Sequence, residues 1–407
     1  MIRFIFDLIN FIGIFSLLPL SIIEIKYFKN SLFFNKLLKK QIINSGPIPI
    51  KISQFIINFQ NLEYKFNKPY YLTIYDELFD NVYKNNIHNI ENYTLINSGS
   101  ICSIYLHSNN REIIKKLHYK SIQSNTFYFT IIKCLFYIFK IPININDFTN
   151  IFFKQFSMNF ESQMQQHFYN SLDNKLIQIP KLIKYNDQEI FMEYLPSKSY
   201  RQSNLSIIKT IKHCNMMAIF FKHMYLEKGI IHLDIHDGNW GINENGIVIY
   251  DFGFSMKLFD PANQNERQIY TDLIFYFLAK DIHKLINCIF QHFISPPLTN
   301  LEFISEILNS ELYLDDSYLL SKLIQKSKIY NYKIHINLYY IFHSTIVLKF
   351  MYNHLFYTDP CFIQENPKIN AINRATHENA IIHTNPYYNS VKEFNNRVIY
   401  YFKTKKV

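Results

Sequence analysis

Short runs of apolar and β-branched residues, bounded by small or turn-forming residues, predict β-strands in several places. Two such runs lie within residues 94–106 and flank a small-residue turn, which predicts a hairpin. A further run at 112–117 follows the turn-forming pair Asn109-Asn110. The runs at 188–195 and 246–250 are apolar over most of their length. We therefore expect a hairpin and a third strand, and later two more strands.

Apolar residues also recur at helical spacing between and after these strands. The run 127–139 predicts an inserted helix, and Met164 and Phe168 lie on one face of another. Beyond residue 300 the chain is helical and aromatic-rich, whereas the polar stretch 365–389 predicts a long loop. The pattern as a whole predicts a mixture of helices and strands.

The first stretch, residues 2–23, is nearly all apolar and approaches the length that crosses a bilayer. In such a span Asp7 and Asn10 would lie in hydrocarbon, and Pro19 is expected to interrupt the helix. No small-residue cleavage site of a secretory signal follows. Two interpretations stay open: the stretch associates with a membrane, or it is a helix packed on the body of the protein.

The composition indicates a large ordered core. Apolar residues make up 48% of the chain and aromatic residues 17%, far more than a disordered chain contains. The net charge of +10 would suit an anionic partner, but the lysines are scattered, so we do not expect nucleic-acid binding. The five cysteines lack C-x-x-C spacing, so they predict neither a disulfide framework nor a zinc site and favour a reducing, intracellular compartment.

The most informative segment is residues 231–239, Ile-His-Leu-Asp-Ile-His-Asp-Gly-Asn, together with Asp251-Phe-Gly downstream. The two have the H-x-D-x-x-x-x-N and D-F-G spacing of kinase-like phosphoryl transfer. This chemistry needs a carboxylate beside the incoming nucleophile and oxygen ligands that hold Mg²⁺ against the phosphates of ATP. We therefore predict that Asp234 is the catalytic carboxylate and that Asn239 and Asp251 bind the metal.

Candidate phosphate contacts precede this loop in the order that such a site requires. The small side chains of Ser98, Gly99 and Ser100 would let backbone N–H groups approach the phosphates, although any hairpin turn could look the same. A lysine of the following strand would contact the phosphates. Strand side chains alternate between faces, so only one of two neighbours can face the cleft: Lys115, which we prefer, or Lys116.

A glutamate on a later helix is expected to hold that lysine in position. Glu161 is the candidate, and an exposed glutamate on an amphipathic helix is the alternative. The strand that ends at Pro196 would form the hinge that meets the adenine, and it places Glu193 in the nucleotide site. The set is complete enough to bind ATP with Mg²⁺.

Over roughly residues 46–290 the chain resembles the UbiB family of atypical kinase-like proteins. Gly46-Pro-Ile-Pro-Ile-Lys-Ile-Ser-Gln54 is similar to the family's G-P-x-x-x-K-x-G-Q element, and its Lys51 and Gln54 would share one helical face and reach the nucleotide cleft. The loop that begins at His232 is similar to H-x-D-P-H-P-G-N, including His236, which ordinary protein kinases lack. The preferred lysine and the helix glutamate also fall on family motifs.

Several positions depart from the family's pattern. Ser53 replaces the glycine of K-x-G-Q, and Ile235 and Asp237 replace the two prolines of the catalytic loop. The family's acidic E-x-D pair falls on Gln155 and Ser157. The extra acidic control of metal binding is therefore in doubt, whereas the minimal set of lysine, glutamate, two aspartates and asparagine is intact.

The resemblance implies an α+β class, a bilobal protein-kinase-like fold with an N-terminal helical extension and a helical insertion in the small lobe. We expect four parts along the chain. Residues 1–45 are an apolar segment in contact with a membrane or the protein body, and residues 46–90 are a helical extension with the K-x-G-Q-like motif. Residues 91–195 form a kinase-like N-lobe, and residues 196–407 form a helical C-lobe with the catalytic loop and D-F-G.

The predicted function is that of a UbiB-type atypical kinase or ATPase, which hydrolyses ATP or transfers phosphate to a non-protein, lipid-linked or isoprenoid acceptor. The resemblance also implies a role in ubiquinone biosynthesis and lipid homeostasis. Intact Asp234 and Asp251 argue against the alternative, a pseudokinase that uses nucleotide as a switch or scaffold. Leu233 in place of the usual arginine, His236 and the missing A-P-E segment disfavour an ordinary protein kinase. The sequence identifies neither the acceptor nor the oligomeric state.

Overall fold

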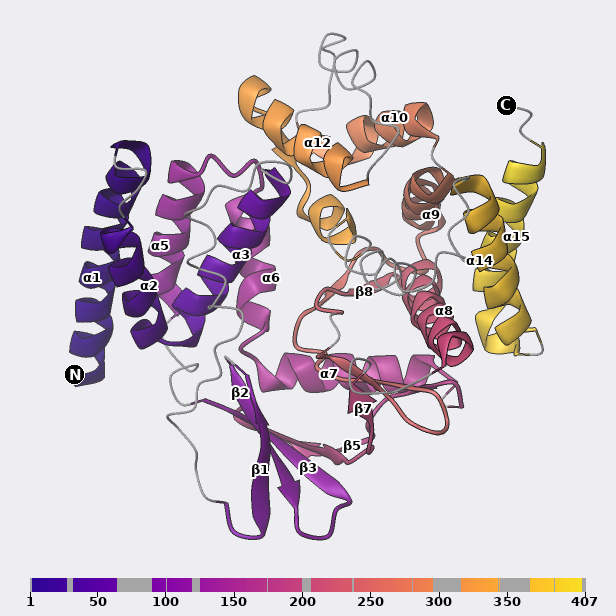
Figure 1. Ribbon diagram of the computed structural model, residues 1–407, viewed down its shortest axis with the longest axis horizontal. Coiled ribbons are helices and arrows are strands. Elements are labelled where there is room, and N and C mark those ends of the chain that lie inside the picture. Colours follow the sequence, from indigo (N-terminus) through magenta and orange to yellow (C-terminus); the bar gives the residue numbers. More distant parts are fainter. Residues whose placement is uncertain are drawn as a thin grey trace.

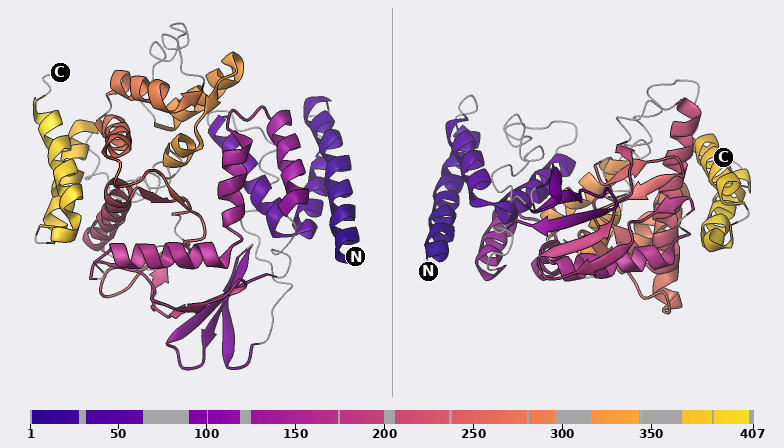
Figure 2. Two further views of the ribbon diagram at one scale, coloured as in Figure 1. Left: turned by 180° about the vertical axis from the view of Figure 1, so that it is seen from behind. Right: turned by 90° about the horizontal axis from the view of Figure 1, so that it is seen from below.

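The computed structural model describes most of the chain, in the ranges 2–27, 32–63, 90–99, 101–118, 125–173, 175–199, 206–235, 238–279, 281–295, 316–342, 344, 367–383 and 385–404. Helices and strands both contribute, which confirms the mixed content expected from the sequence. The N-terminal helices lie at one end and the C-terminal helices at the opposite end (Figure 1; Figure 2). An antiparallel sheet projects from the region between them (Figure 1).

A five-stranded sheet contains the predicted hairpin and the strands that pair with it. Its order is β1-β2-β3-β6-β5, with bounds Tyr93–Ser98 for β1, Cys102–His107 for β2, Glu112–Leu117 for β3, Leu182–Tyr185 for β5 and Glu189–Glu193 for β6. All of its pairings are antiparallel. A small apolar core lies under β2, β3 and β6. The strands predicted at 94–106, 112–117 and 188–195 are confirmed.

Three helices lie in the chain between β3 and β5 of this sheet. Helix α7 (Met158–Ser171) packs on β5 and β6, and its first turn is capped by Ser157, whose Oγ accepts a hydrogen bond from the N–H of Phe160 at 3.2 Å. Helices α5 (Asn125–Ile138) and α6 (Ile145–Lys154) lie between β3 and α7, and α5 covers the helical run predicted at 127–139. This order brings α7 beside the strand that carries Lys115.

The N-terminal helices are α1 (Ile2–Tyr27), α2 (Phe33–Ser45) and α3 (Pro47–Glu63). The expected interruption at Pro19 is wrong, because α1 continues through this residue. The neighbouring Ile14 and Leu18 are buried where α1 packs against α2, and this packing offsets the lost backbone hydrogen bond. Among the described residues, no helix combines the length and hydropathy needed to cross a membrane.

Helices dominate the C-terminal half. They are α8 (Ile207–His223) with its π-helical end η5 (Met224–Lys228), α9 (Gln264–Ala279), α10 (Ile282–His292), α12 (Asp316–Tyr330), α14 (Pro367–Ile381) and α15 (Asn389–Thr404), with a 3-10 turn η7 (Pro386–Tyr388) between the last two. Residues 336–342 are also helical. The long loop predicted over 365–389 is therefore wrong, because most of it forms α14, which packs on α8 and α15.

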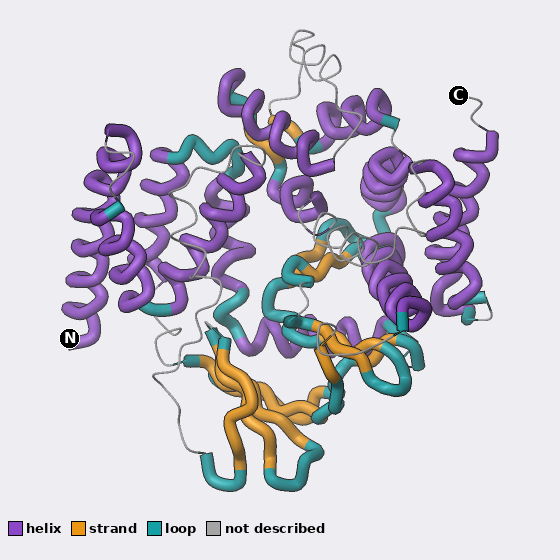
Figure 3. Tube along the Cα trace, in the orientation of Figure 1, coloured by secondary structure: helices purple, strands orange, loops and turns teal. Residues whose placement is uncertain are grey.

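Short strands hold the central loops together. The strands β4 (Ile177–Gln178), β10 (Ile247–Ile249), β9 (Trp240–Ile242) and β7 (Lys198–Ser199) form one small sheet, β8 (Ile230–His232) pairs with β11 (Ser255–Lys257), and β12 (Ile294–Ser295) pairs with β13 (Lys333–Ile334). Strand β10 lies within the run predicted at 246–250. Figure 3 shows that the loops between these strands gather at the centre of the molecule, beside α7.

Candidate active site

A cavity of about 930 Å³ lies where the five-stranded sheet, α3, α6, α7 and the central loops meet. Its size is at the upper end of the range of about 300–1,000 Å³ that holds small-molecule ligands. Every described residue that the sequence assigns to the site lines this cavity: Lys51, Gln54, Ser98, Gly99, Lys115, Glu161, Glu193, Asp234, Asn239 and Asp251. Two further residues of interest, Ser100 and His236, lie outside the described residues.

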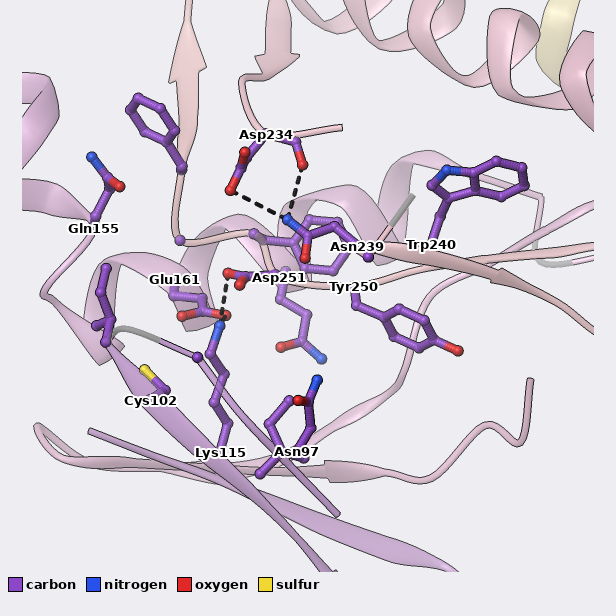
Figure 4. A pocket seen from close by; sticks show the side chains of 18 of the residues that line it. Asn97, Cys102, Lys115, Gln155, Glu161, Asp234, Asn239, Trp240, Tyr250 and Asp251 are labelled. Atoms are coloured by element: carbon purple, nitrogen blue, oxygen red, sulfur yellow. Dashed lines mark hydrogen bonds and ion pairs between the residues drawn. The ribbon is translucent and has the colours of Figure 1, made fainter. Parts of the chain in front are cut away.

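The strand register decides between the two candidate lysines. Lys115 is buried, and its Nζ lies 2.6 Å from Oε1 of Glu161 and 2.7 Å from Oδ1 of Asp251 (Figure 4). Lys116 points to the other face of β3 and pairs with Glu189 at 2.6 Å. The structure thus brings Lys115, Glu161 and Asp251 together from three distant parts of the chain, and Glu161 is a buried partner of the lysine, not an exposed helix residue.

The pKa values of all three groups in this ion-pair cluster are shifted from their ordinary values. Burial lowers the pKa of a lysine, but the charges of Asp251 and Glu161 outweigh it and raise the pKa of Lys115. Burial raises the pKa of Glu161 to about 7, against the opposing charge of Lys115. For Asp251 burial acts against ionisation, but the ammonium group dominates at a side chain that is 43% exposed, and it lowers the pKa. Lys115 and Asp251 are therefore charged at neutral pH, where Glu161 titrates.

Glu161 is fixed by the D-F-G segment as well as by the lysine. Its Oε2 faces Gly253, the last residue of that segment. Gly253 permits this approach, because a Cβ at that position would lie only 3.0 Å from Oε2 of Glu161. A carboxylate that is paired with a lysine and packed this closely against the backbone cannot rotate freely, so it sets the position of the ammonium group.

His232 connects the catalytic loop to the D-F-G segment. Its Nδ1 accepts a hydrogen bond from the N–H of Asp234 at 3.2 Å, so Nε2 carries the proton and donates to the carbonyl of Tyr250 at 3.1 Å. The pairing of β8 with β11 is a second connection between the two segments. Beyond the paired residues, the N–H of Leu233 also donates a hydrogen bond to the carbonyl of Phe254 at 2.8 Å. These contacts give His232 a structural role, which is to hold the catalytic loop against the D-F-G segment.

Asn239 is oriented by the aspartate five positions before it. Its Nδ2 donates to the carbonyl of Asp234 at 2.9 Å and to Oδ2 of that residue at 3.3 Å (Figure 4). The amide nitrogen is thus committed to the loop, and Oδ1 is left to accept or coordinate. Asp251 has a positive φ of 57°, a conformation that aspartate adopts more readily than most residues and that is typical of functional sites.

The oxygen atoms of Asn239 and Asp251 fit Mg²⁺, a hard cation that proteins usually hold with one or two carboxylates completed by phosphate oxygens and water. Within the described part of the chain, no group of three or more His, Cys, Asp and Glu side chains could hold a metal ion by itself. A divalent ion at this position would therefore need the phosphates of a nucleotide as further ligands.

The small-residue turn between β1 and β2 is closed by several contacts. Ser98 Oγ and Ser103 Oγ are 3.0 Å apart, and the N–H of Gly99 donates to the carbonyl of Cys102 at 2.8 Å. The buried His118, at the end of β3, places Nε2 2.9 Å from the carbonyl of Gly99. Sequence reasoning missed His118, because a single histidine after a strand belongs to no motif.

The remaining predicted residues enter from the cavity's borders. Lys51 and Gln54 project from α3, and the charge of Lys51 helps to lower the pKa of Asp251. Glu193 ends β6 and is exposed, and its N–H already donates to the carbonyl of Lys181 at 2.9 Å. Sequence reasoning also missed the aromatic residues that line the cavity, although Phe55 follows Lys51 by one helical turn.

Comparisons with known proteins agree with this geometry at the level of the domain. Residues 109–289 match the model of the ABC1 atypical kinase-like domain. The matched part runs from β3 into α10 and supports an atypical kinase with a nucleotide partner, although proteins with such a domain can be inactive. It contains the ion-pair cluster and the catalytic loop, whereas the K-x-G-Q-like element precedes it.

No curated protein sequence matches the chain significantly. Among solved structures, the Rv3197–erythromycin complex from Mycobacterium tuberculosis is similar at 14% identity with a TM-score of 0.39. That alignment covers 54% of this chain and 59% of the other, so the chain spans less than two thirds of that structure's length.

Proposed function

We propose that this protein is an atypical kinase-like enzyme of UbiB type that binds ATP with Mg²⁺ in the cavity and transfers the γ-phosphoryl group to a non-protein acceptor or to water. One observation carries the proposal: the cluster of Lys115, Glu161 and Asp251 lines the same cavity as Asp234 and Asn239. This is the residue set that positions a nucleotide, a metal and an incoming nucleophile.

Nucleotide binding would use the sheet side of the cavity. Lys115, held by Glu161, would contact the phosphates, and the turn at Ser98 and Gly99 would lie over them, because its small side chains leave room for a close approach. The adenine would lie against the end of β6, near Glu193. Lys51 and Gln54 would close the cavity from α3 and add a positive charge beside the phosphates.

Asn239 and Asp251 would hold Mg²⁺, which when bound neutralises phosphate charge and fixes the phosphate geometry. Asp251 is now paired with Lys115 at 2.7 Å, so the lysine must turn toward the phosphates when Asp251 takes up the metal. Glu161 would keep the lysine in the site during that exchange, because it holds the same Nζ at 2.6 Å.

Asp234 would act on the nucleophile. The acceptor oxygen forms a bond to the γ-phosphorus while the bond from that phosphorus to the bridging oxygen of ADP breaks, and the acceptor's proton passes to the carboxylate of Asp234. The hydrogen bond that Asp234 accepts from Asn239 and the one that it donates to His232 hold the loop, and Asp234 lines the cavity. A general base typically contributes about 10²- to 10⁴-fold in rate.

The finer features of the family belong to the same proposal. The sheet with α7 would be the N-lobe and the helical remainder the C-lobe of a bilobal fold, with α5 and α6 as the insertion. The acceptor would be lipid-linked or isoprenoid, in ubiquinone or other lipid metabolism, in an intracellular setting. The exposed side chains of Tyr27 and Phe33, at 66% and 61%, support contact of the α1–α2 hairpin with a membrane.

The experiment that tests this proposal compares wild type with Asp234→Asn. We expect Mg²⁺-dependent ATP binding, detected as a thermal shift, in both proteins, and turnover that falls by about 10²- to 10⁴-fold in the variant. Asp260→Asn is the matched control, because Asp260 is exposed and lies outside the cavity lining. Binding without Asp234-dependent turnover would select the nucleotide-switch alternative, and absence of Mg²⁺–ATP binding would refute both.

A further inference from the structure

His118 is the first residue after β3, and its side chain contacts the turn that joins β1 to β2. The residue is only 4% exposed and does not line the cavity, whereas Gly99 of the turn does. It also lies three positions after Lys115 in the chain. Buried polar side chains in proteins are hydrogen-bonded, so the contacts of this ring indicate what it does.

The imidazole ring of His118 holds one carbonyl group of the turn. Its Nε2 lies 2.9 Å from the carbonyl oxygen of Gly99. A carbonyl oxygen can only accept a hydrogen bond, so Nε2 carries the proton and donates it. Because His118 does not line the cavity, this hydrogen bond directs the oxygen of Gly99 toward the protein interior.

The backbone of His118 holds the other side of the same turn. Its N–H donates to the carbonyl of Ile101 at 2.9 Å, which continues the pairing of β2 with β3 beyond the last residue of β3. The N–H of Gly99 is satisfied as well, by the carbonyl of Cys102 at 2.8 Å. His118 therefore connects both sides of the turn to the strand that carries Lys115.

The orientation of the Gly99 carbonyl matters for an anionic ligand. A carbonyl oxygen carries a partial negative charge, so it repels a phosphate group that it faces. In the proposed function the phosphates lie beneath this turn and contact Lys115. An oxygen bound by His118 does not face them, whereas the peptide of a glycine that lacks this partner can rotate, because no side chain restricts it.

We propose that His118 is a positioning residue for the phosphates of the nucleotide: it holds the carbonyl of Gly99 away from them and keeps the turn in a fixed place relative to Lys115. This inference rests on the proposed function, and it adds to the nucleotide site a residue from outside the cavity lining. His118 affects binding only through the turn. The adenine side of the site, at the end of β6, does not depend on it.

The test measures binding to the full chain of Mg²⁺–ATP, by isothermal titration calorimetry, and of adenosine, by saturation-transfer NMR. His118→Phe keeps an aromatic ring and removes the donor, so it should weaken Mg²⁺–ATP binding about tenfold. Adenosine has no phosphates, so its affinity should stay within about twofold. His118→Gln keeps an N–H donor near the position of Nε2 and should restore most of the lost affinity.

His107→Phe is the matched control. His107 supports the other hairpin turn of the sheet, where its Nδ1 accepts a hydrogen bond from the N–H of Asn109 at 3.1 Å, and it does not line the cavity. This substitution should leave both affinities unchanged. Circular-dichroism melting checks that each variant is folded, and His118→Leu replaces His118→Phe if the latter unfolds.

The inference is overturned if the folded His118→Phe protein binds Mg²⁺–ATP as wild type does, or if adenosine is weakened as much as Mg²⁺–ATP. Equal losses in His118→Gln and His118→Phe would also overturn it, because the hydrogen bond of the ring would then not be the cause. Any of these results, with Mg²⁺–ATP binding present in wild type, would remove this inference alone. Failure of wild type to bind Mg²⁺–ATP would remove the proposed function and this inference with it.

Discussion

Two lysine–carboxylate clusters in this molecule have the same shortest contact but different surroundings. In the cavity, Lys115 lies 2.6 Å from Glu161. Between α8, α14 and α15, Lys222 lies 2.6 Å from Glu378. Distance alone therefore does not separate a functional ion pair from a structural one.

The difference lies in what surrounds the pair. Lys222 also donates to Asn395 Oδ1 at 2.8 Å, and Asn395 Nδ2 donates back to Glu378 at 3.0 Å, so the cluster is closed on itself and lines no part of the cavity. The cluster at Lys115 has a second carboxylate, Asp251, which is 43% exposed and has a positive φ. A closed network contributes stability, whereas an open one keeps the capacity to exchange partners with a ligand.

The largest expected effect is a loss of stability on changing the closed cluster of Lys222, Glu378 and Asn395. Lys222→Met leaves the buried carboxylate of Glu378 without its cation, which should lower the free energy of unfolding by about 3–5 kcal/mol. Urea unfolding followed by circular dichroism measures it. ATP affinity of the folded variant should equal that of wild type.

The control for this variant is the double change Lys222→Met with Glu378→Gln. A neutral amide removes the uncompensated charge and still accepts from Asn395, so most of the lost stability should return. If Lys222→Met costs less than about 1 kcal/mol, the cluster does not carry the stability assigned to it, and the contrast between the two clusters fails.

The second largest expected effect is a loss of nucleotide affinity on changing the open cluster of Lys115, Glu161 and Asp251. Lys115→Met should weaken Mg²⁺–ATP binding about 10- to 100-fold, the loss expected for a charged hydrogen-bond donor. It should destabilise the protein less than Lys222→Met, because Glu161 can take up a proton and Asp251 is partly exposed. Isothermal titration calorimetry and urea unfolding give the two values.

Lys116→Met is the matched control, since it removes the neighbouring lysine from the opposite face of β3. Its affinity should stay within about threefold of wild type, because its partner Glu189 does not line the cavity. Equal losses for both lysines would mean that general positive charge, and not the cluster geometry, governs binding.

Local spacing explains why part of this site could be predicted from sequence. The residues of the catalytic loop and D-F-G lie within about twenty positions, and the intervening strand has its own apolar signal. The sequence favours Lys115 over Lys116 only with the help of a family motif, because alternation along a strand defines two faces but does not say which of them lines the cleft. The strand register shown by the structure supplies that information.

The errors and omissions concern contacts between distant segments. The polar composition of the stretch 365–389 predicts a loop, yet Ala375 and Glu378 share the buried face of α14, and Ile382, directly after the helix, is buried as well. Glu378 can be buried only because Lys222, 156 residues earlier, neutralises it. No local pattern contains that partner, and the same holds for the aromatic residues that line the cavity, which come from segments far apart in the chain.

The smallest expected effect is a pH dependence that arises from the open cluster alone. Burial raises the pKa of Glu161 to about 7 from an ordinary value of 4.5, so the folded protein binds this proton more tightly than the unfolded chain. Glu161 thus favours folding below its unfolded pKa, and that contribution is lost as the pH rises through about 7. Mg²⁺–ATP affinity should instead increase as the pH rises, because the ionised carboxylate is the form that holds Lys115.

Protonated Glu161 leaves Lys115 paired with Asp251, the carboxylate that we assign to Mg²⁺, and the lysine then competes with the metal. Mg²⁺–ATP affinity should therefore fall several-fold between about pH 8 and pH 6 in wild type, and this part of the dependence should vanish in Glu161→Gln. Titration of the nucleotide's own phosphate affects both proteins equally, so the difference between the two profiles is the quantity to measure. Identical profiles would show that Glu161 does not change its charge in this range, and the exchange of Lys115 between two carboxylates would lose its basis.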